Sequence, residues 1–81
     1  MSPTVHREGP FRYFFFSNEG TELPHVHVES PDGNAKVWIG TGELANHTGI
    51  RPADLARITA TVREHRAQFM EAWHGHFGAK D

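Results

Sequence analysis

The sequence predicts an α+β fold: a small antiparallel β-sheet of three to five strands, built from about residues 4–46, packed on one long C-terminal α-helix at about residues 52–77. Residues 25–29 alternate polar and apolar side chains with the period of two that is typical of a half-buried strand. After Pro52 the apolar residues recur instead every three or four positions, which is the spacing of one helix face. This change of period indicates a sheet followed by a helix.

The strands of the predicted sheet follow one another along the chain. Residues 4–7 favour a short edge strand, and the aromatic-rich run of residues 11–16, bounded by turn-forming residues, favours the next one. Residues 31–34 are Pro-Asp-Gly-Asn, a sequence that is typical of a tight turn. This turn predicts a hairpin between strands at residues 25–29 and 35–39.

The register of the hairpin follows from its turn. A four-residue turn places Ser30 opposite Ala35, and therefore Glu29 opposite Lys36. In the preceding strand we expect Arg12 beside Glu29, so that opposite charges alternate across three strands. The positions between the polar residues of the hairpin are mostly valine and isoleucine, and we expect them to face the helix.

The predicted helix begins near Pro52, because proline suits the first helical position and Asp54 favours the positive end of the helix dipole. Gly78 suits its end. Residues 43–45, before the helix, fit either a short strand or one helical turn. The apolar stripe of the helix consists of Leu55, Ile58, Val62, Phe69, Trp73 and Phe77.

Composition limits the classes of function. The 81 residues provide room for one domain, residues 1–81, and contain no cysteine, which excludes thiolate chemistry and cysteine-based zinc sites. The longest apolar run, residues 13–16, is far too short to span a membrane, so we expect a cytoplasmic protein without membrane contact. The net charge is −2 and no lysine- or arginine-rich run exists, which disfavours nucleic acid as a partner.

Histidine is the unusual feature of the composition. The chain has seven histidines, and no two are adjacent. His25 and His27 lie two positions apart on a predicted strand, so they point to one side with Cα atoms about 6.5 Å apart. That side is turned away from the helix if Val26 and Val28 face the helix. Glu29 continues the same row.

Three interpretations of this histidine row are open. The two rings can pack on neighbouring aromatic side chains, chelate a metal ion, or act as acid and base in proton transfer. We expect no cofactor and no metal requirement; a divalent metal, if one binds, would use His25 and His27. Glu29 and His65 are further catalytic candidates, although His65 lies beside the helix stripe and therefore on the other side of the sheet.

Five short motifs follow one another along the chain, namely Phe14-Phe15-Phe16-Ser17-Asn18-Glu19-Gly20, Pro24-His25-Val26-His27-Val28-Glu29, Ala35-Lys36-Val37-Trp38-Ile39, Arg63-Glu64-His65-Arg66 and Glu71-Ala72-Trp73-His74. In this order they resemble the small bacterial family called "domain of unknown function 4160". The resemblance implies a compact sheet-plus-helix protein, often encoded beside a small partner in arrangements like toxin–antitoxin pairs, and no established reaction. The chain departs from the family pattern at Leu23, where proline is common, and at Arg51, where serine often stands.

The face that carries the histidines is also aromatic. We expect Phe14, Phe16 and Trp38 on this face and the loop residues Asn18 and Glu19 beside it. Together these rings would exceed the apolar surface of about a few hundred Å² that monomers usually expose. A partner or a ligand should therefore cover the face.

The leading hypothesis is an interaction module that acts as a homodimer or with a small operon-encoded partner, in a toxin–antitoxin-like or regulatory setting. The first alternative is a small histidine-dependent hydrolase, such as a ribonuclease, that uses His25 and His27. The second alternative is a single-stranded nucleic-acid binder that stacks bases on Phe14, Phe16 and Trp38. The sequence alone does not choose between an enzyme and a binding module.

Overall fold

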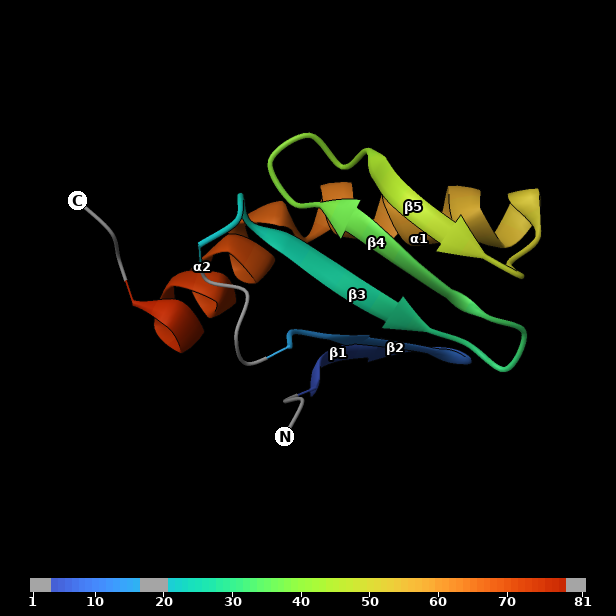
Figure 1. The fold of residues 1–81 in the computed structure, drawn as a ribbon, viewed down its shortest axis with the longest axis horizontal. Helices are drawn as coiled ribbons and strands as arrows, with labels where there is room; N and C mark the ends of the chain where they lie inside the picture. The colour runs from blue at the N-terminus through green and yellow to red at the C-terminus, as the bar shows by residue number, and fades with distance from the viewer. Residues whose placement is uncertain (1–3, 17–20, 79–81) are drawn as a thin grey trace.

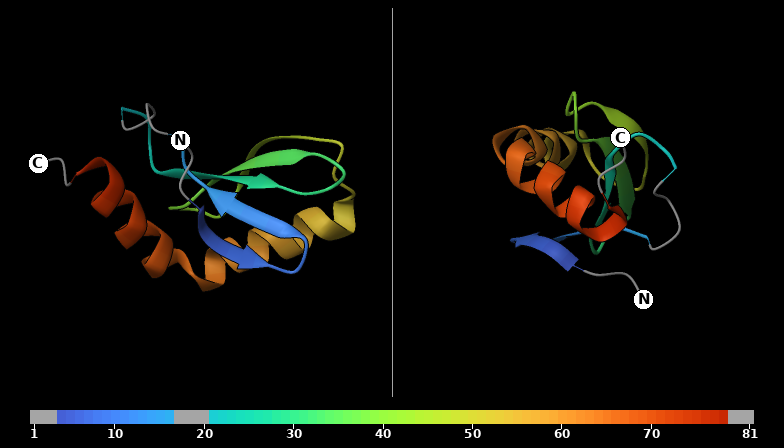
Figure 2. Two further views of the ribbon diagram at one scale, coloured as in Figure 1. Left: turned by 90° about the horizontal axis from the view of Figure 1, so that it is seen from below. Right: turned by 90° about the vertical axis from the view of Figure 1, so that its left-hand side faces the viewer.

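A five-stranded antiparallel sheet and two C-terminal helices make up the computed structural model, which describes residues 4–16 and 21–78. The elements are β1 (Thr4–Glu8), β2 (Phe11–Phe14), β3 (His25–Glu29), β4 (Asn34–Trp38), β5 (Leu44–Thr48), α1 (Pro52–Glu64) and α2 (Arg66–Phe77). The strands lie in the sheet in chain order, and both helices lie on the same side of it (Figure 1, Figure 2). The predicted α+β fold class is confirmed.

One face of the sheet packs on the helices because apolar side chains occupy alternate positions on its strands. Val26, Val28 and Val37 have no exposed surface, which confirms the predicted apolar face. Burial of each such side chain contributes about 1.5–3 kcal/mol relative to exposure. The core consists of Phe11, Tyr13, Phe15, Val26, Val28, Ala35, Val37, Ile39, Ile50, Leu55, Ile58, Val62, Phe69 and Trp73.

The β3–β4 hairpin has the predicted faces but a different register. Glu29 pairs with Asn34 instead of Lys36, and Lys36 pairs with His27, so the prediction was wrong by two residues. Because side chains alternate with a period of two, this shift leaves each one on the face that was predicted for it. In the β2–β3 pair, the predicted pairing of Arg12 with Glu29 is confirmed.

Hydrogen bonding in the turn explains the shifted register. The Ser30 amide donates to the Gly33 carbonyl at 2.9 Å, and the Ser30 hydroxyl oxygen accepts from the amides of Asp32 and Gly33 at 3.2 Å each. A Cβ at Gly33 would collide with the carbonyl of Thr48 on β5, so only glycine fits there. Ser30 therefore belongs to the turn, and the first residue pair of the β3–β4 ladder is Glu29 with Asn34.

The predicted single helix is two helices that meet at His65, which has φ −107° and ψ 23°. Neither proline nor glycine lies at this break. Two tertiary contacts hold it instead: the His65 ring centroid lies 4.9 Å from that of His6 on β1, and Arg66 Nε donates to the Ile39 carbonyl at 3.2 Å. The apolar stripe continues through both helices, so each still faces the sheet.

The segment between β4 and the helices forms a strand. Here β5 pairs with β4, so the sheet extends slightly beyond its predicted limit near residue 46. The helical region begins at Pro52 and ends at Phe77, as predicted. Within residues 4–16 and 21–78, no helix is both long and apolar enough to cross a membrane.

Candidate functional site

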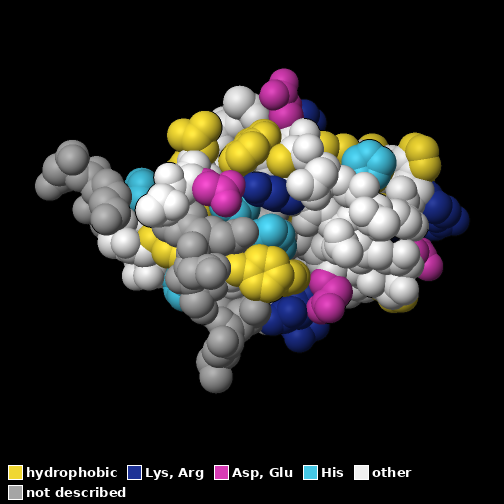
Figure 3. Space-filling model, viewed as in Figure 1, with side chains coloured by type: hydrophobic (Ala, Val, Ile, Leu, Met, Phe, Trp, Pro, Cys, Tyr) yellow, Lys and Arg dark blue, Asp and Glu magenta, His cyan; other side chains and the backbone are white. Residues whose placement is uncertain are grey.

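The second face of the sheet, called the open sheet face below, is turned away from both helices (Figure 1). Figure 3 shows hydrophobic, histidine and charged side chains close together on one half of it, whereas backbone and other side chains, drawn white, cover much of the other half. Strand alternation assigns to this face the side chains of Arg12, Phe14, His25, His27, Glu29, Asn34, Lys36, Trp38, Asn46 and Thr48, of which His25, at the start of β3, is covered by α2.

His27 lies in a group of rings on the open sheet face. Its ring centroid is 4.4 Å from that of Phe16 and 5.7 Å from that of Phe14. Phe14 is only 8% exposed, with the Arg12 guanidinium 4.5 Å from its ring centroid, whereas Phe16 is 42% exposed. Phe16 and the half-buried His27 therefore form the accessible part of this group.

His25 is placed differently from what the sequence predicts. Its side chain is fully buried, and its ring contacts Trp73 of α2 (centroids 5.1 Å apart) as well as Trp38 of β4 (5.7 Å). The expectation that both strand histidines point away from the helices is wrong for His25, because α2 lies against the start of β3. Its Nδ1 donates to the Leu23 carbonyl at 2.9 Å, which fixes a proton on that nitrogen. The buried ring supports the neighbouring ring of His27, 5.1 Å away.

The charges of the open sheet face are paired between segments of the chain. Arg12 and Glu29 lie 3.3 Å apart, and Lys36 Nζ lies 2.9 Å from a carboxylate oxygen of Glu22 and 4.8 Å from the Trp38 ring centroid. The predicted contact of Arg12 with Glu29 is confirmed, but Lys36 uses Glu22 instead of Glu29. Exposed pairs of this kind contribute about 0–1 kcal/mol each, so their main effect is to arrange the charges.

Two hollows flank these groups. One of about 420 Å³ is lined by Phe16, His27 and Asn46, among others, and lies on the open sheet face. The other, of about 230 Å³, lies beside Leu23 and Trp38. Leu23 is 74% exposed, so the lining of this second hollow includes apolar surface in contact with water.

The remaining predicted site residues fall in three places. Asn18 and Glu19 lie outside the described residues. Glu29 is exposed and paired with Arg12. His65 does not join the strand histidines but lies on the helix side of the sheet, where its ring contacts His6.

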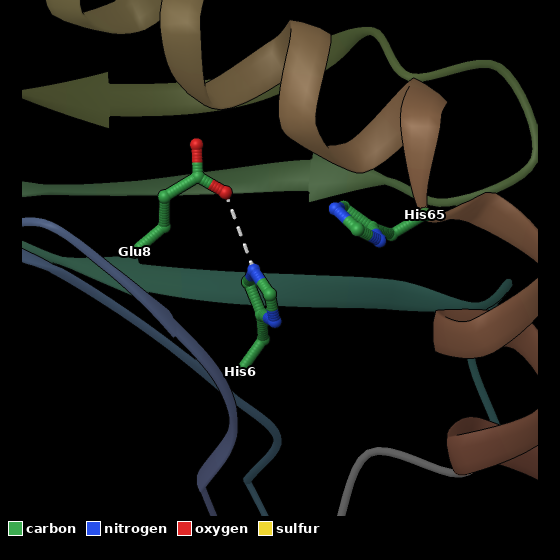
Figure 4. A group of neighbouring side chains, drawn as sticks. All are labelled: His6, Glu8 and His65. Carbon is green, nitrogen blue, oxygen red and sulfur yellow. Dashed lines mark hydrogen bonds and ion pairs between the residues drawn. The ribbon is translucent and has the colours of Figure 1, made fainter.

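His6, Glu8 and His65 form a second group of titratable side chains (Figure 4). His6 Nε2 lies 3.3 Å from a Glu8 carboxylate oxygen, and one ligand atom from each of the three residues lies within 4.8 Å of the others. The Thr61 hydroxyl donates to the other Glu8 oxygen at 3.2 Å. The hydrogen bond from His6 lowers the pKa of Glu8, although partial burial opposes this effect.

Sequence reasoning missed His6 and Glu8. The available signal was a histidine on the predicted edge strand of residues 4–7 and a glutamate two positions later, directly after that strand. The deciding feature is a β-bulge between Thr4 and His6, which shifts the pairing of β1 with β2. Thr4 faces the open side, where its hydroxyl accepts a hydrogen bond from Arg12 at 2.7 Å, while the bulge turns His6 to the helix side.

Fold and sites together define a small α+β domain: an antiparallel meander backed by a broken C-terminal helix, with an aromatic-histidine face open and a His-Glu-His group at the sheet edge. The chain belongs to the family described as "Domain of unknown function (DUF4160)", whose model matches residues 11–74. This match confirms the family resemblance of the sequence motifs. No curated protein and no solved structure matches the chain.

Proposed function

We propose that the protein is an interaction module whose open sheet face binds a second copy of the chain. One observation carries the proposal: the large apolar side chains that are most exposed among the described residues, Phe16 and Leu23, both border this face. Two half-buried side chains lie next to them: the His27 ring contacts Phe16, and Trp38 lines the same hollow as Leu23. A partner on this face would remove from water the apolar surface that the fold leaves exposed.

The charges of the face suit a contact between identical copies. A two-fold axis brings the same surface together from both sides, so each cation needs a carboxylate within the same patch. The patch offers this balance, because Arg12 lies with Glu29 and Lys36 with Glu22. Two copies can therefore meet with opposite charges facing one another.

The two alternatives have less support. Hydrolysis by a pair of histidines requires both rings at the substrate, and His25 has no exposed surface. Binding of single-stranded nucleic acid requires cations for the phosphates, and Arg12 and Lys36 both contact carboxylates. A small operon-encoded protein, in a toxin–antitoxin-like or other regulatory setting, is the other candidate occupant of the face.

Sedimentation velocity on the wild type and on a Phe16→Ser/Leu23→Ser double variant tests the proposal. We expect a concentration-dependent dimer for the wild type and a monomer for the variant, which lacks the two exposed apolar side chains of the contact. The variant should still fold, because neither side chain belongs to the core. The matched control is an Ala56→Ser/Ala60→Ser double variant on the exposed side of α1, which should dimerise like the wild type. A monomeric wild type, or a Phe16→Ser/Leu23→Ser variant that dimerises equally well, would contradict the homodimer.

Association should weaken as the pH falls through the ordinary histidine range. The contact would desolvate His27, which penalises its charged form, and Lys36 lies opposite it in the sheet as a second positive charge. The negative charge of Glu29 offsets little of this penalty on charged His27, because Glu29 is paired with Arg12. The dimer fraction should therefore be larger at about pH 8 than at about pH 5.5, on either side of the usual histidine pKa. A His27→Gln variant should lose this difference; if it keeps the difference, another group is responsible.

A further inference from the structure

Three potential metal ligands meet at the edge of the sheet on its helix side. His6 and Glu8 project from β1, and His65 occupies the break between α1 and α2 (Figure 4). Two irregularities bring them together, namely the β-bulge before His6 and the helix break itself. Bulges are frequent next to functional sites, where they re-aim a side chain. The group lies on the side away from the open sheet face, so it is independent of the proposed dimer contact.

The spacing of the donor atoms fits one metal ion. Ligand atoms at about 2.0–2.2 Å from a tetrahedral zinc ion lie about 3.4 Å from one another. His6 Nε2 and Glu8 Oε1 are 3.3 Å apart, and donor atoms of all three residues lie within 4.8 Å of one another. The separations that involve His65 are at most 4.8 Å, so shortening them by up to about 1.4 Å would bring the three donor atoms to tetrahedral spacing.

Neighbouring side chains orient the carboxylate. The Thr61 hydroxyl donates to Glu8 Oε2, which leaves Oε1 directed to the histidines. The fully buried Tyr13 packs its ring 5.4 Å from that of His6. The carboxylate is thus held by a hydrogen bond on one oxygen, and the His6 imidazole is held by a buried aromatic ring.

We propose that His6, Glu8 and His65 bind a divalent transition-metal ion of the zinc type. Two imidazole nitrogens and one carboxylate oxygen are ligands that suit such an ion. The side chains of His6 and Glu8 are 20% and 46% exposed, so an ion can enter from solvent. Three protein ligands leave at least one coordination position for water or an external ligand, as in zinc sites of the open type.

Calorimetric titration of zinc into the metal-free protein tests the site. We expect one strong site per chain, weakened by more than about 100-fold in His65→Gln and in Glu8→Gln, because loss of even an outer-shell partner costs about 10–100-fold. Thr61→Val removes such an outer-shell hydrogen bond and should weaken binding by about 10-fold. Cobalt in place of zinc should give the visible absorption of a site with fewer than six ligands in the wild type and lose it in Glu8→Gln.

The matched control is a His74→Gln/His76→Gln variant, which removes two exposed histidines of α2 from outside the group and should bind zinc like the wild type. The Phe16→Ser/Leu23→Ser variant should also keep its zinc affinity, which separates this proposal from the dimer. Absence of a strong site in the wild type, unchanged affinity in His65→Gln and Glu8→Gln, or a loss confined to the His74/His76 variant would overturn the proposal. If His65→Gln fails to fold, Glu8→Gln decides, because Glu8 is exposed and outside the core.

Discussion

The two histidine pairs of the fold are assembled in different ways. His25 and His27 are two positions apart on β3, whereas His6 and His65 come from opposite ends of the chain. In the first pair, one ring is buried and bonded to the backbone and the other packs on phenylalanine rings. In the second pair, both rings lie around one carboxylate at a solvent-accessible edge.

This difference shows why a conspicuous local motif need not be the site of chemistry. Residues two apart on a strand lie on the same face, where they pack on their neighbours. His25 is buried in this way although it belongs to a His-x-His motif. Donor atoms that surround a single point must come from several directions, which only tertiary structure supplies. For the same reason, the group of His6, Glu8 and His65, which has only the pair His6 and Glu8 as a local signature, has the geometry of a ligand site.

The largest expected difference is between the effects of His25 and His27 on stability. His25→Ala should lower the free energy of unfolding by about 2–4 kcal/mol, because it empties a buried volume and leaves the Leu23 carbonyl without its donor. His27→Ala, on the half-buried neighbour, should cost less than about 1.5 kcal/mol. Urea denaturation measures both values. Equal small losses would show that His25 has no structural role.

Metal removal and addition should affect the second pair, His6 and His65. The protein should stay folded with a chelator present, because the core is formed by apolar side chains and includes none of the three proposed ligands. Zinc at about 100 times its Kd should add about 2.7 kcal/mol to the free energy of unfolding of the wild type, but not of His65→Gln. Circular dichroism with and without chelator, followed by thermal unfolding, measures both effects. Collapse of the signal on chelation would mean that the metal is required for folding.

The smallest effect concerns the Glu8 carboxyl in the metal-free protein. Its pKa is lowered first by the hydrogen bond from His6, with burial in opposition and Thr61 as a further lowering influence. Because the folded pKa lies below the unfolded one, the ionised carboxylate stabilises the fold above its unfolded pKa, and this stability is lost as the pH falls through the folded pKa. Thr61→Val should raise the pKa of Glu8, as measured by a carbon-detected NMR titration. An unchanged pKa would exclude the Thr61 hydrogen bond in solution.

Much of the fold could be predicted because local chemistry decides it. Alternation in residues 25–29 and 35–39 assigns the two faces, and the charges of Arg12 and Glu29 give the β2–β3 pairing. Pro52 marks the start of the helical region. Each of these features depends on residues that are close in sequence or on a simple repeat.

The other features depend on contacts that the sequence does not encode locally. The hairpin register depends on the hydrogen bonds that the Ser30 hydroxyl accepts in the turn. The helix break at His65 is held by contacts to other elements rather than by proline or glycine. The position of His6 depends on a β-bulge, and no residue type in β1 indicates that bulge. The candidate metal site therefore could not be predicted, because it depends on both the bulge in β1 and the break between the helices being in place together.

We propose that the two histidine pairs have different roles: His25 and His27 serve the core and the open sheet face, and His6 and His65 bind an external ligand. Nitrogen-15 NMR of the imidazole rings during a zinc titration tests this most directly. We predict that the ring resonances of His6 and His65 shift with zinc while those of His25 and His27 stay in place. Shifts of the His25 and His27 rings, with His6 and His65 unchanged, would contradict it.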